Sequence, residues 1–321
     1  MIPNVSETST YQVNQVVIGA TGAEGGTRSH GVTIGGAKTL PMLHSDGYAG
    51  CRPLIAIDVL DRPPEDWNAL LMEAYGDAVK DSGAWAKKAV EFGADVVCVV
   101  LEGIHPDKGD LDAAHAVAAV TQIKKAVGAP LMVWRSEDNV KDNEVLPKVS
   151  EALKGERALF GTVTQENYKR LTGVCMADGH ALITEAPLDI NMAKQVNILV
   201  TDMGFPAERL VMYQTTGALG YGIEYAYSIQ ERQRIAALQG DKMLAMPVVA
   251  SAGLEAWNAK EARTPETEMP AWGPQSGRGV LWEAVTALAL IHGGADIVRM
   301  RHPEAVKIVK QMINRFYPGT V

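Results

Sequence analysis

The sequence has few cysteines, and they do not form a recognisable metal motif. Among the 321 residues there are three, Cys51, Cys98 and Cys175, and none of them is near another along the chain. Without a CxxC pair the chain offers no zinc ribbon and no iron–sulfur motif of its own. We therefore expect three buried thiols in a reducing compartment.

Positive charge and long apolar runs are also scarce. The chain carries 30 Lys and Arg against 38 Asp and Glu, a net charge of −8. A nucleic-acid-binding protein needs a basic face for the phosphates, so we expect no nucleic-acid partner. No uncharged apolar run reaches about 18 residues, and MIPNVSETST lacks the basic and apolar parts of a signal peptide. We expect no membrane span and a cytoplasmic protein.

A recurring helix–glycine–strand junction organises what the sequence does contain. The glycines of these junctions are Gly93, Gly128, Gly155, Gly179, Gly204, Gly240 and Gly294. Glycine ends a helix in the left-handed conformation without steric cost. The apolar segments that follow are short and continuous, as is typical of strands buried on both faces of a parallel sheet.

The junctions, together with RPLIAIDVL in front of them, predict eight strands with helices between them and after the last. The strands fall at about 54–59, 96–101, 130–135, 158–162, 181–185, 209–213, 247–251 and 296–300. Eight β–α units over roughly 270 residues are the size of one (β/α)8 TIM barrel. We predict an α/β protein with this barrel as a single domain over 51–321. A doubly wound sheet is the alternative architecture.

The two ends of this pattern need separate interpretation. Residues 1–50 contain QVNQVVIGA and SHGVTIGG joined by a glycine-rich turn, which predicts an N-terminal extension with a β-hairpin that closes the bottom of the barrel. Residues 252–279 give a 28-residue connection before the next helix, and connections of this length are usually functional or mobile. Trp257 and Trp272 in it either anchor a partner or fold the loop onto the barrel.

Polar residues follow most of the predicted strands, and in a barrel these strand ends meet at one mouth, where ligands bind. The candidates are Glu102, His105, Arg135, Thr162, Glu185, Gln214, Thr215, Thr216, Ser251, Arg301 and His302. Glu102 and Glu185 could act as an acid–base pair or as hydrogen-bonded structural groups. His105 is a metal ligand or, more often in such a place, a hydrogen-bonded loop residue. We assign no catalytic and no metal-ligating residue.

A glycine-rich turn, GALGYG at 217–222, precedes a predicted helix. Gly217, Gly220 and Gly222 are spaced GxxGxG, and no Lys-Ser/Thr follows, so the turn is neither a dinucleotide-binding loop nor a P-loop. Two interpretations remain open. The turn is a tight connection before a helix, or its N–H groups face an oxygen-rich ligand.

Several long segments resemble one family. These are IGATGAEGGTRSHGVTIGG (18–36), TQENYKRLTGVCMADGHALITEAPLDINMAKQVNIL (164–199), GALGYGIEYAYSIQERQRIAALQGDKMLAMPVV (217–249), LEAWNAKEA (254–262) and GVLWEAVTALALIHGGADIVRMRHPEAV (279–306). They are similar to the small (delta) subunit of the corrinoid iron–sulfur protein, a part of the acetyl-CoA decarbonylase/synthase system of the Wood–Ljungdahl pathway. The segments span most of the chain.

The resemblance implies a (β/α)8 barrel that shares a corrinoid (cobalamin) with a large (gamma) subunit, which also carries a [4Fe–4S] cluster. In the family the corrinoid lies between the large subunit and the barrel mouth. A separate methyltransferase delivers the methyl group of methyltetrahydrofolate to cobalt, and acetyl-CoA synthase / CO dehydrogenase receives it. A non-catalytic barrel of this kind fits a chain without cluster cysteines and without the corrinoid-ligand pattern Asp-x-His-x-x-Gly, since LHSDG has Met42 at the Asp position.

The same resemblance bears on individual residues. It implies that Thr215, Thr216, Gly217 and Leu219 lie near the amide-rich rim of the corrinoid. The barrel also resembles pterin-binding methyltransferases, which use Asp and Asn at several strand ends. Here Tyr213 and Gln214 stand where Asp-Pro is usual. Likewise Thr162 stands where Asn is common, and Glu102 replaces Asp. These departures argue against the alternative function, a methyltetrahydrofolate:corrinoid methyltransferase.

Overall fold

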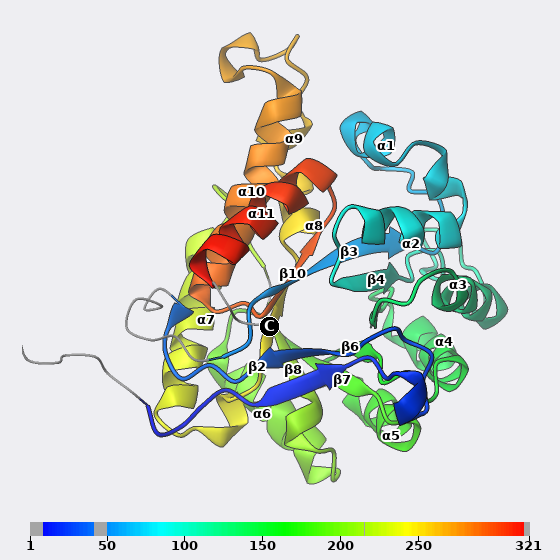
Figure 1. The fold of residues 1–321 in the computed structure, drawn as a ribbon, viewed down its shortest axis with the longest axis vertical. Coiled ribbons are helices and arrows are strands. Elements are labelled where there is room, and N and C mark those ends of the chain that lie inside the picture. The colour runs from blue at the N-terminus through cyan, green and yellow to red at the C-terminus, as the bar shows by residue number, and fades with distance from the viewer. Residues whose placement is uncertain (1–8, 42–49, 215, 318–321) are drawn as a thin grey trace, which may run out of the picture.

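A closed ring of parallel strands forms the centre of the molecule (Figure 1). The computed structural model describes residues 9–41, 50–214 and 216–317. Within them the ring has the order β10–β3–β4–β5–β6–β7–β8–β9. Its strands are β3 (Leu54–Leu60), β4 (Val96–Val100), β5 (Leu131–Trp134), β6 (Leu159–Val163), β7 (Ala181–Ala186), β8 (Leu210–Gln214), β9 (Val248–Ala250) and β10 (Ile297–Met300). The predicted TIM barrel is confirmed, and the doubly wound sheet is wrong.

Helices follow the strands and cover the outside of the ring. They are α1 (Ala69–Tyr75), α2 (Ser82–Glu91), α3 (Ala113–Ala126), α4 (Asn139–Ala152), α5 (Tyr168–Asp178), α6 (Ile190–Asp202), α7 (Ile223–Leu238), α8 (Ala252–Asn258), α9 (Lys260–Arg263), α10 (Gln275–Gly293) and α11 (Pro303–Phe316). Aspartates cap several of them. The carboxylates of Asp112, Asp138 and Asp189 accept hydrogen bonds from the first-turn N–H groups of α3, α4 and α6.

Alternation along each strand divides the apolar residues between two cores. In β3, Ile55, Ile57 and Val59 belong to the core between the ring and the helices. Leu54 and Ala56 belong to the core inside the ring. Because successive side chains point to opposite faces of a strand, one continuous apolar run supplies both cores. This is why the strands read as unbroken hydrophobic segments in the sequence.

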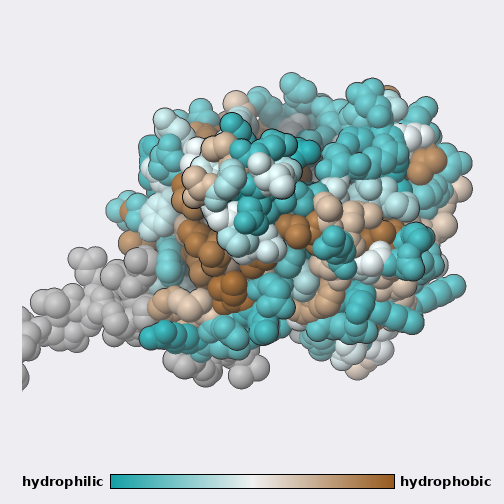
Figure 2. Space-filling model, turned by 90° about the horizontal axis from the view of Figure 1, so that it is seen from above, coloured by the Kyte–Doolittle hydropathy of each residue, from teal (hydrophilic) through white to brown (hydrophobic). Residues whose placement is uncertain are grey.

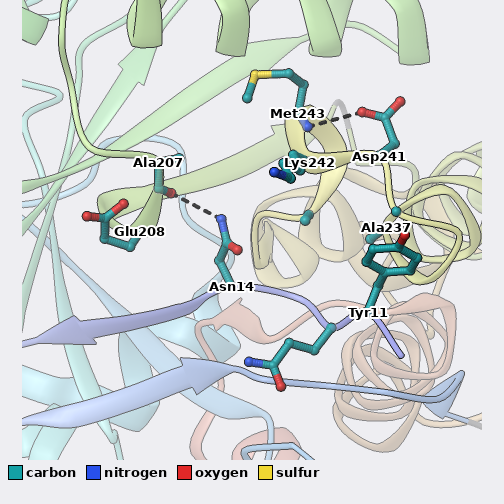
Figure 3. A pocket seen from close by; sticks show the side chains of 11 residues that line it. Tyr11, Asn14, Ala207, Glu208, Ala237, Asp241, Lys242 and Met243 are labelled. Atoms are coloured by element: carbon teal, nitrogen blue, oxygen red, sulfur yellow. Dashed lines mark hydrogen bonds between the residues drawn. The ribbon is translucent and has the colours of Figure 1, made fainter. Parts of the chain in front are cut away.

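An N-terminal hairpin closes the bottom of the barrel, as predicted. Strands β1 (Gln15–Ile18) and β2 (Val32–Gly35) pair antiparallel, and Val16, Ile18 and Ile34 pack against the core inside the ring. The Gly19 N–H donates to the Arg157 carbonyl at 2.8 Å, just before β6. A cavity of about 310 Å³ lies at this same end. On its wall Asn14 Nδ2 donates to the Ala207 carbonyl at 3.4 Å (Figure 3).

The connection over 252–279 is not the long loop that the sequence predicts. It contains α8, α9 and a 3-10 helix, η6 (Pro270–Trp272), and α10 already begins at Gln275. The Trp257 side chain is buried on the barrel and donates from Nε1 to Glu283 Oε2 at 2.7 Å. Trp272 is half-buried, with the Arg278 guanidinium 5.3 Å from its ring. The tertiary contact of Trp257 therefore helps to make a helix of a segment whose polar composition predicts a loop.

The cysteines and the apolar helices bear on two expectations from composition. Cys98 and Cys175 are buried as expected, whereas Cys51 is only partly buried because it lies at the edge of the barrel bottom before β3. In the described part of the chain, no helix combines the length and the apolar character that a bilayer crossing requires.

Candidate functional site at the barrel mouth

A cavity of about 310 Å³ opens at the C-terminal ends of β4, β5 and β10. Four of the predicted residues line it: Glu102, His105, Arg135 and Arg301. Residues that were not among the candidates also line it: Val100, Asp107, Lys108, Trp134, Ser136, Glu137, Leu254 and Arg299. The mouth is therefore a polar cavity built from one half of the ring.

Arg299 occupies the centre of the mouth. Its Nε donates to Asp58 Oδ1 at 3.0 Å and its Nη1 to Ser251 Oγ at 3.0 Å. The guanidinium carbon lies 3.9 Å from the ring centroid of Trp134, which meets Tyr213 edge-on at 4.9 Å. Arg299 is only 2% exposed, so this buried cation is stabilised by one carboxylate and one aromatic face.

A second ion-pair network surrounds Arg135. Its Nε donates to Thr162 Oγ1 at 2.7 Å, and its Nη2 donates to Glu185 Oε2 at 2.9 Å. The carboxylate of Asp142 lies 3.4 Å from Nη1. Burial lowers the pKa of Arg135, but the ion pairs with Glu185 and Asp142 outweigh it, and the net shift is upward. Glu185 is therefore part of a structural ion pair. This is one of the two interpretations that the sequence leaves open for Glu102 and Glu185.

Glu283 on α10 holds the end of β10 in place from behind the mouth. Its carboxylate accepts from Trp257 Nε1 at 2.7 Å, from the Arg301 N–H at 2.5 Å and from the His302 N–H at 3.0 Å. Burial raises the pKa of Glu283 to about 7, although these donors favour the charged form. This one side chain connects α8, α10 and the loop that carries Arg301.

Carboxyl groups with raised pKa values also lie around the cavity itself. Burial raises the pKa of Glu137 and the pKa of Glu255. Arg301 opposes the shift at Glu255, while the charge of Glu137 adds to it. Glu137 adopts a left-handed backbone with φ +80°, a conformation that is costly for a residue other than glycine.

Some predicted residues lie just behind the cavity lining. Thr162 and Glu185 bind Arg135, and Ser251 binds Arg299. Thr216 is buried one step further back, where its Oγ1 accepts from the Ser251 N–H at 3.0 Å. The structure therefore brings these residues together at the mouth as supports of the arginines that line it. Thr215 lies outside the described residues.

Gln214 faces away from the mouth. It is fully buried, and its Nε2 donates to Gln233 Oε1 on α7. Tyr213, one residue earlier, belongs to the core inside the ring. Because strand side chains alternate, only one of these two neighbours can face the inside of the barrel. The expectation that Gln214 reaches a ligand in the mouth is therefore wrong.

His105 and His302 both make local hydrogen bonds to the turns in which they lie. His105 Nδ1 accepts from the Asp107 N–H at 3.1 Å. His302 Nδ1 accepts from the Glu304 N–H at 3.2 Å, which caps α11, and its ring stacks on Trp257 at 5.7 Å. His105 remains on the cavity wall, whereas His302 is a helix cap beside it.

The glycine-rich turn has a structural explanation. A Cβ on Gly217 would lie 2.6 Å from the carbonyl carbon of Gly222, and Gly222 itself has φ +90°. The Leu219 N–H donates to Thr286 Oγ1 at 3.2 Å, and the Leu219 carbonyl accepts from Trp282 Nε1 at 3.0 Å. The turn thus folds tightly on itself and rests on α10. A contact between its N–H groups and a ligand stays a prediction.

Leu219 belongs to a different surface feature. With Trp282 and Val285 it lines an apolar groove of about 460 Å³ beside α10. Viewed from above, on the side where α9 and α10 lie in Figure 1, hydrophobic residues gather in a patch among hydrophilic ones (Figure 2). Leu219 is on this groove and not among the residues that line the mouth cavity.

Sequence reasoning missed Trp134 and Glu283 and did not select Arg299. A usable signal existed for two of them. Trp134 is the aromatic residue at the very end of an apolar strand, and Glu283 is an isolated acid within the apolar helix VLWEAVTALAL. An isolated charge in such a run indicates a buried and hydrogen-bonded group. The partner of Arg299, Asp58, cannot be found from local sequence because it lies 241 residues away.

The solved structures with a similar fold include dihydropteroate synthases. Dihydropteroate synthase from Stenotrophomonas maltophilia matches with a TM-score of 0.56 at 15% identity, over 84% of this chain and 95% of that one. The enzyme from Coxiella burnetii, solved in complex with pteroic acid, gives a TM-score of 0.56 at 13% identity, over 85% and 97%. At these identities the similarity shows the fold alone.

Sequence comparison is more specific. Subunit delta of the acetyl-CoA decarbonylase/synthase complex of Archaeoglobus fulgidus is 38% identical over 309 residues, which cover 94% of this chain and 68% of the relative. The corresponding subunit of Methanopyrus kandleri is 36% identical over 311 residues, covering 96% and 76%. A family model for the CO dehydrogenase/acetyl-CoA synthase delta subunit matches residues 15–317. The chain therefore belongs to the delta-subunit family of CO dehydrogenase/acetyl-CoA synthase.

Proposed function

We propose that this chain is the small subunit of a heterodimeric corrinoid methyl carrier of the Wood–Ljungdahl pathway. Its mouth would cover a corrinoid shared with a large (gamma) subunit, which would carry the [4Fe–4S] cluster. The further partners would be a methyltetrahydrofolate methyltransferase and acetyl-CoA synthase / CO dehydrogenase. Family membership supports a subunit role in such a complex. The observation that carries the proposal is a mouth whose charged groups mostly bind one another.

The ion pairs of the mouth suit a binding face better than a reactive centre. Arg135 is held by Glu185 and Asp142, and Arg299 is held by Asp58. A general acid or base must be free to exchange a proton with a substrate, and side chains locked in buried ion pairs are poorly suited to that. These networks would instead keep the mouth rigid against a bound group.

The rim of the mouth offers apolar side chains that fit a large flat ligand. Exposed hydrophobic residues lie at or just before the N-terminal ends of α4, α6 and α7, which face the mouth: Val140, Leu188, Met192, Tyr221 and Tyr225. The cavity inside this rim offers hydrogen-bond donors and acceptors. An apolar macrocycle with polar side arms, such as a corrinoid, fits both parts. When bound, the corrinoid would supply the cobalt chemistry, and this chain would orient it and exclude water.

The alternative, a pterin-binding methyltransferase, is disfavoured by the end of β8. Tyr213 stands where a carboxylate would be needed, and Gln214 turns toward α7. The centre of the mouth is filled by Arg299 stacked on Trp134. No carboxylate from β8 remains there to bind a pterin ring. The pteroic acid in the Coxiella burnetii structure is a ligand of that dihydropteroate synthase and does not indicate a pterin site in this chain.

Purification from the native cell tests the proposal. The chain would be isolated alone and in any complex, followed by cobalt and iron analysis and a visible spectrum. We expect cobalt and iron only in a complex with a larger chain. Titration of the isolated chain with methyltetrahydrofolate, followed by calorimetry, should give no heat of binding. A colourless chain that co-purifies with no corrinoid-bearing partner and binds methyltetrahydrofolate would contradict the proposal.

A further inference from the structure

We propose that Asp61 and His115 form a proton-dependent latch that holds the loop between β4 and α3 (101–112) against the barrel, so that one wall of the mouth loosens as the pH rises. Four residues of this loop line the mouth cavity: Glu102, His105, Asp107 and Lys108. The use of that cavity for a cofactor rests on the function proposed above. The latch rests on the contacts of the pair and is testable on the chain by itself.

The two side chains face each other through atoms that have no other partner. Asp61 directly follows β3, and its side chain is fully buried. Its Oδ1 accepts from the Gly103 N–H in the loop at 2.8 Å. Its Oδ2 lies 3.3 Å from Nε2 of His115 in the first turn of α3. In the part of the chain that the structure describes, both atoms are shielded from solvent and neither makes a hydrogen bond. One proton between Oδ2 and Nε2 would give each of them a partner.

Burial favours one shared proton on this pair. With one proton the pair has no net charge, and without it a full negative charge lies where water does not reach. Burial raises the pKa of Asp61 above its ordinary value of 3.8, and the charge of Glu102 adds to the rise, although the Gly103 N–H and His115 oppose it. The closed loop therefore binds the proton more tightly than an open loop does. The stability that this contributes is fully present below the ordinary pKa of Asp61, and it is lost as the pH rises through the raised pKa.

Other charged side chains around the pair come from the loops after β3 and β4 and from the cap of α3: Arg62, Asp66, Glu102, Lys108 and Asp112. Lys108 lies 3.0 Å from the carboxylate of Asp66 and 3.6 Å from that of Glu102. The Asp112 carboxylate accepts from the His115 N–H at 3.0 Å. Among the described residues, no side chain of α2 or α4 forms an ion pair with either member of the pair. Loss of the shared proton is therefore not offset by another cation in contact with the buried carboxylate.

The loop carries its own backbone hydrogen bonds, so it is held or released as a unit. The Leu111 N–H donates to the Gly103 carbonyl at 3.0 Å and closes the loop at its base. The ion pairs that join the loop to Asp66 and to Lys141 have exposed members and contribute little. Ile104 is buried in the core, a contact that does not depend on pH. Among the polar contacts of the loop, the bond from the Gly103 N–H to the buried carboxylate is therefore the one that the proton sets.

Hydrogen exchange measured by NMR on the full chain, between about pH 5 and about pH 8, tests the latch. The amides of Gly103 and Leu111 report the opening of the loop, after correction for the intrinsic exchange rate at each pH. A closed loop that holds one proton more than the open loop loses up to about tenfold in protection per pH unit. We expect the protection of both amides to fall at least about tenfold over this range. The Thr164 amide, which donates to Asn167 Oδ1 in the loop after β6, has no titratable acceptor and should stay level.

Three variants separate the shared proton from a merely structural contact. Asp61→Asn keeps an acceptor for the Gly103 N–H but does not titrate, so the fall should be absent. His115→Leu should move the fall to higher pH, because the histidine no longer opposes the raised pKa of Asp61. Asp112→Asn is the matched control, since asparagine caps a helix as well as aspartate does, and it should keep the fall of the wild type.

The outcomes separate this inference from the proposed function. Level protection of Gly103 and Leu111 in the wild type, or the same fall in Asp61→Asn as in the wild type, would overturn the latch. If Asp61→Asn fails to fold by circular dichroism, His115→Leu decides, and a fall at an unchanged pH would overturn the latch. No corrinoid takes part in this experiment, so its failure leaves the proposed function standing. Native purification without a corrinoid-bearing partner would contradict the proposed function and leave the latch standing.

Discussion

Replacing Glu283 by glutamine should change how the stability of the barrel depends on pH. The carboxyl group is fully buried, and burial raises its pKa from the ordinary value of 4.5 to about 7. The folded state therefore binds the proton more tightly than the unfolded state does. The stability that this contributes is fully present below the unfolded pKa, and it is lost as the pH rises through the folded pKa.

The size of the effect follows from linkage. With pKa values of 4.5 unfolded and about 7 folded, the free energy of unfolding falls by about 2.5 kcal/mol between about pH 5 and about pH 8. Glutamine does not titrate, so this fall is absent in Glu283→Gln. Glutamine also offers one acceptor oxygen to three N–H donors, which adds a cost of about 1–3 kcal/mol at every pH. The difference in stability between wild type and variant should therefore shrink as the pH rises.

Urea unfolding followed by circular dichroism, at several pH values, measures this difference. Only the change of the difference with pH is compared, so the constant cost of the lost acceptor cancels. Glu268→Gln, an exposed residue in the loop before η6, serves as the matched control and should track the wild type across the range. A wild-type-to-variant difference that stays constant, or that grows with rising pH, would refute the reasoning.

Three further predictions concern packing and backbone geometry. Trp134→Ala should lower the free energy of unfolding by about 3–5 kcal/mol, because the ring is buried and covers a buried guanidinium, and urea unfolding would show it. Arg28→Met should cost about 3–5 kcal/mol, because Glu156 is left buried without its 2.8 Å ion pair, and limited proteolysis should then cut near the hairpin; unchanged protection would contradict this. Gly217→Ala should lower the melting temperature, since its Cβ would lie 2.6 Å from a backbone carbonyl carbon, whereas Gly173→Ala in α5 has open space and should raise stability by up to about 1 kcal/mol. Equal melting temperatures for the two glycine variants would speak against that account.

Much of the fold could be predicted because its signals are local. The helix–glycine junctions mark where each strand begins, and the continuous apolar runs place the strands within one or two residues of their observed bounds. The glycines at 93, 155, 179, 204, 240 and 294 all have the positive φ that the helix-end interpretation requires. The hairpin was visible as alternation around a glycine-rich turn. The helices within 252–279 could not be seen in the sequence, because their apolar residues find partners only in the folded barrel.

The sequence by itself determined the barrel, its hairpin and the family, since these depend on periodicity, turn chemistry and long matching segments. Only the tertiary structure decided which strand-end residues reach the mouth. In β8 the Gln214 side chain faces outward and the Tyr213 side chain faces inward. A shift of the strand register by one residue would reverse this, and no local signal in the sequence fixes the register. Closure of the ring also brings Arg299 to Asp58, and α10 brings Glu283 to the backbone of Arg301. The chemistry of the mouth depends on these distant pairs, and only chain closure places them together.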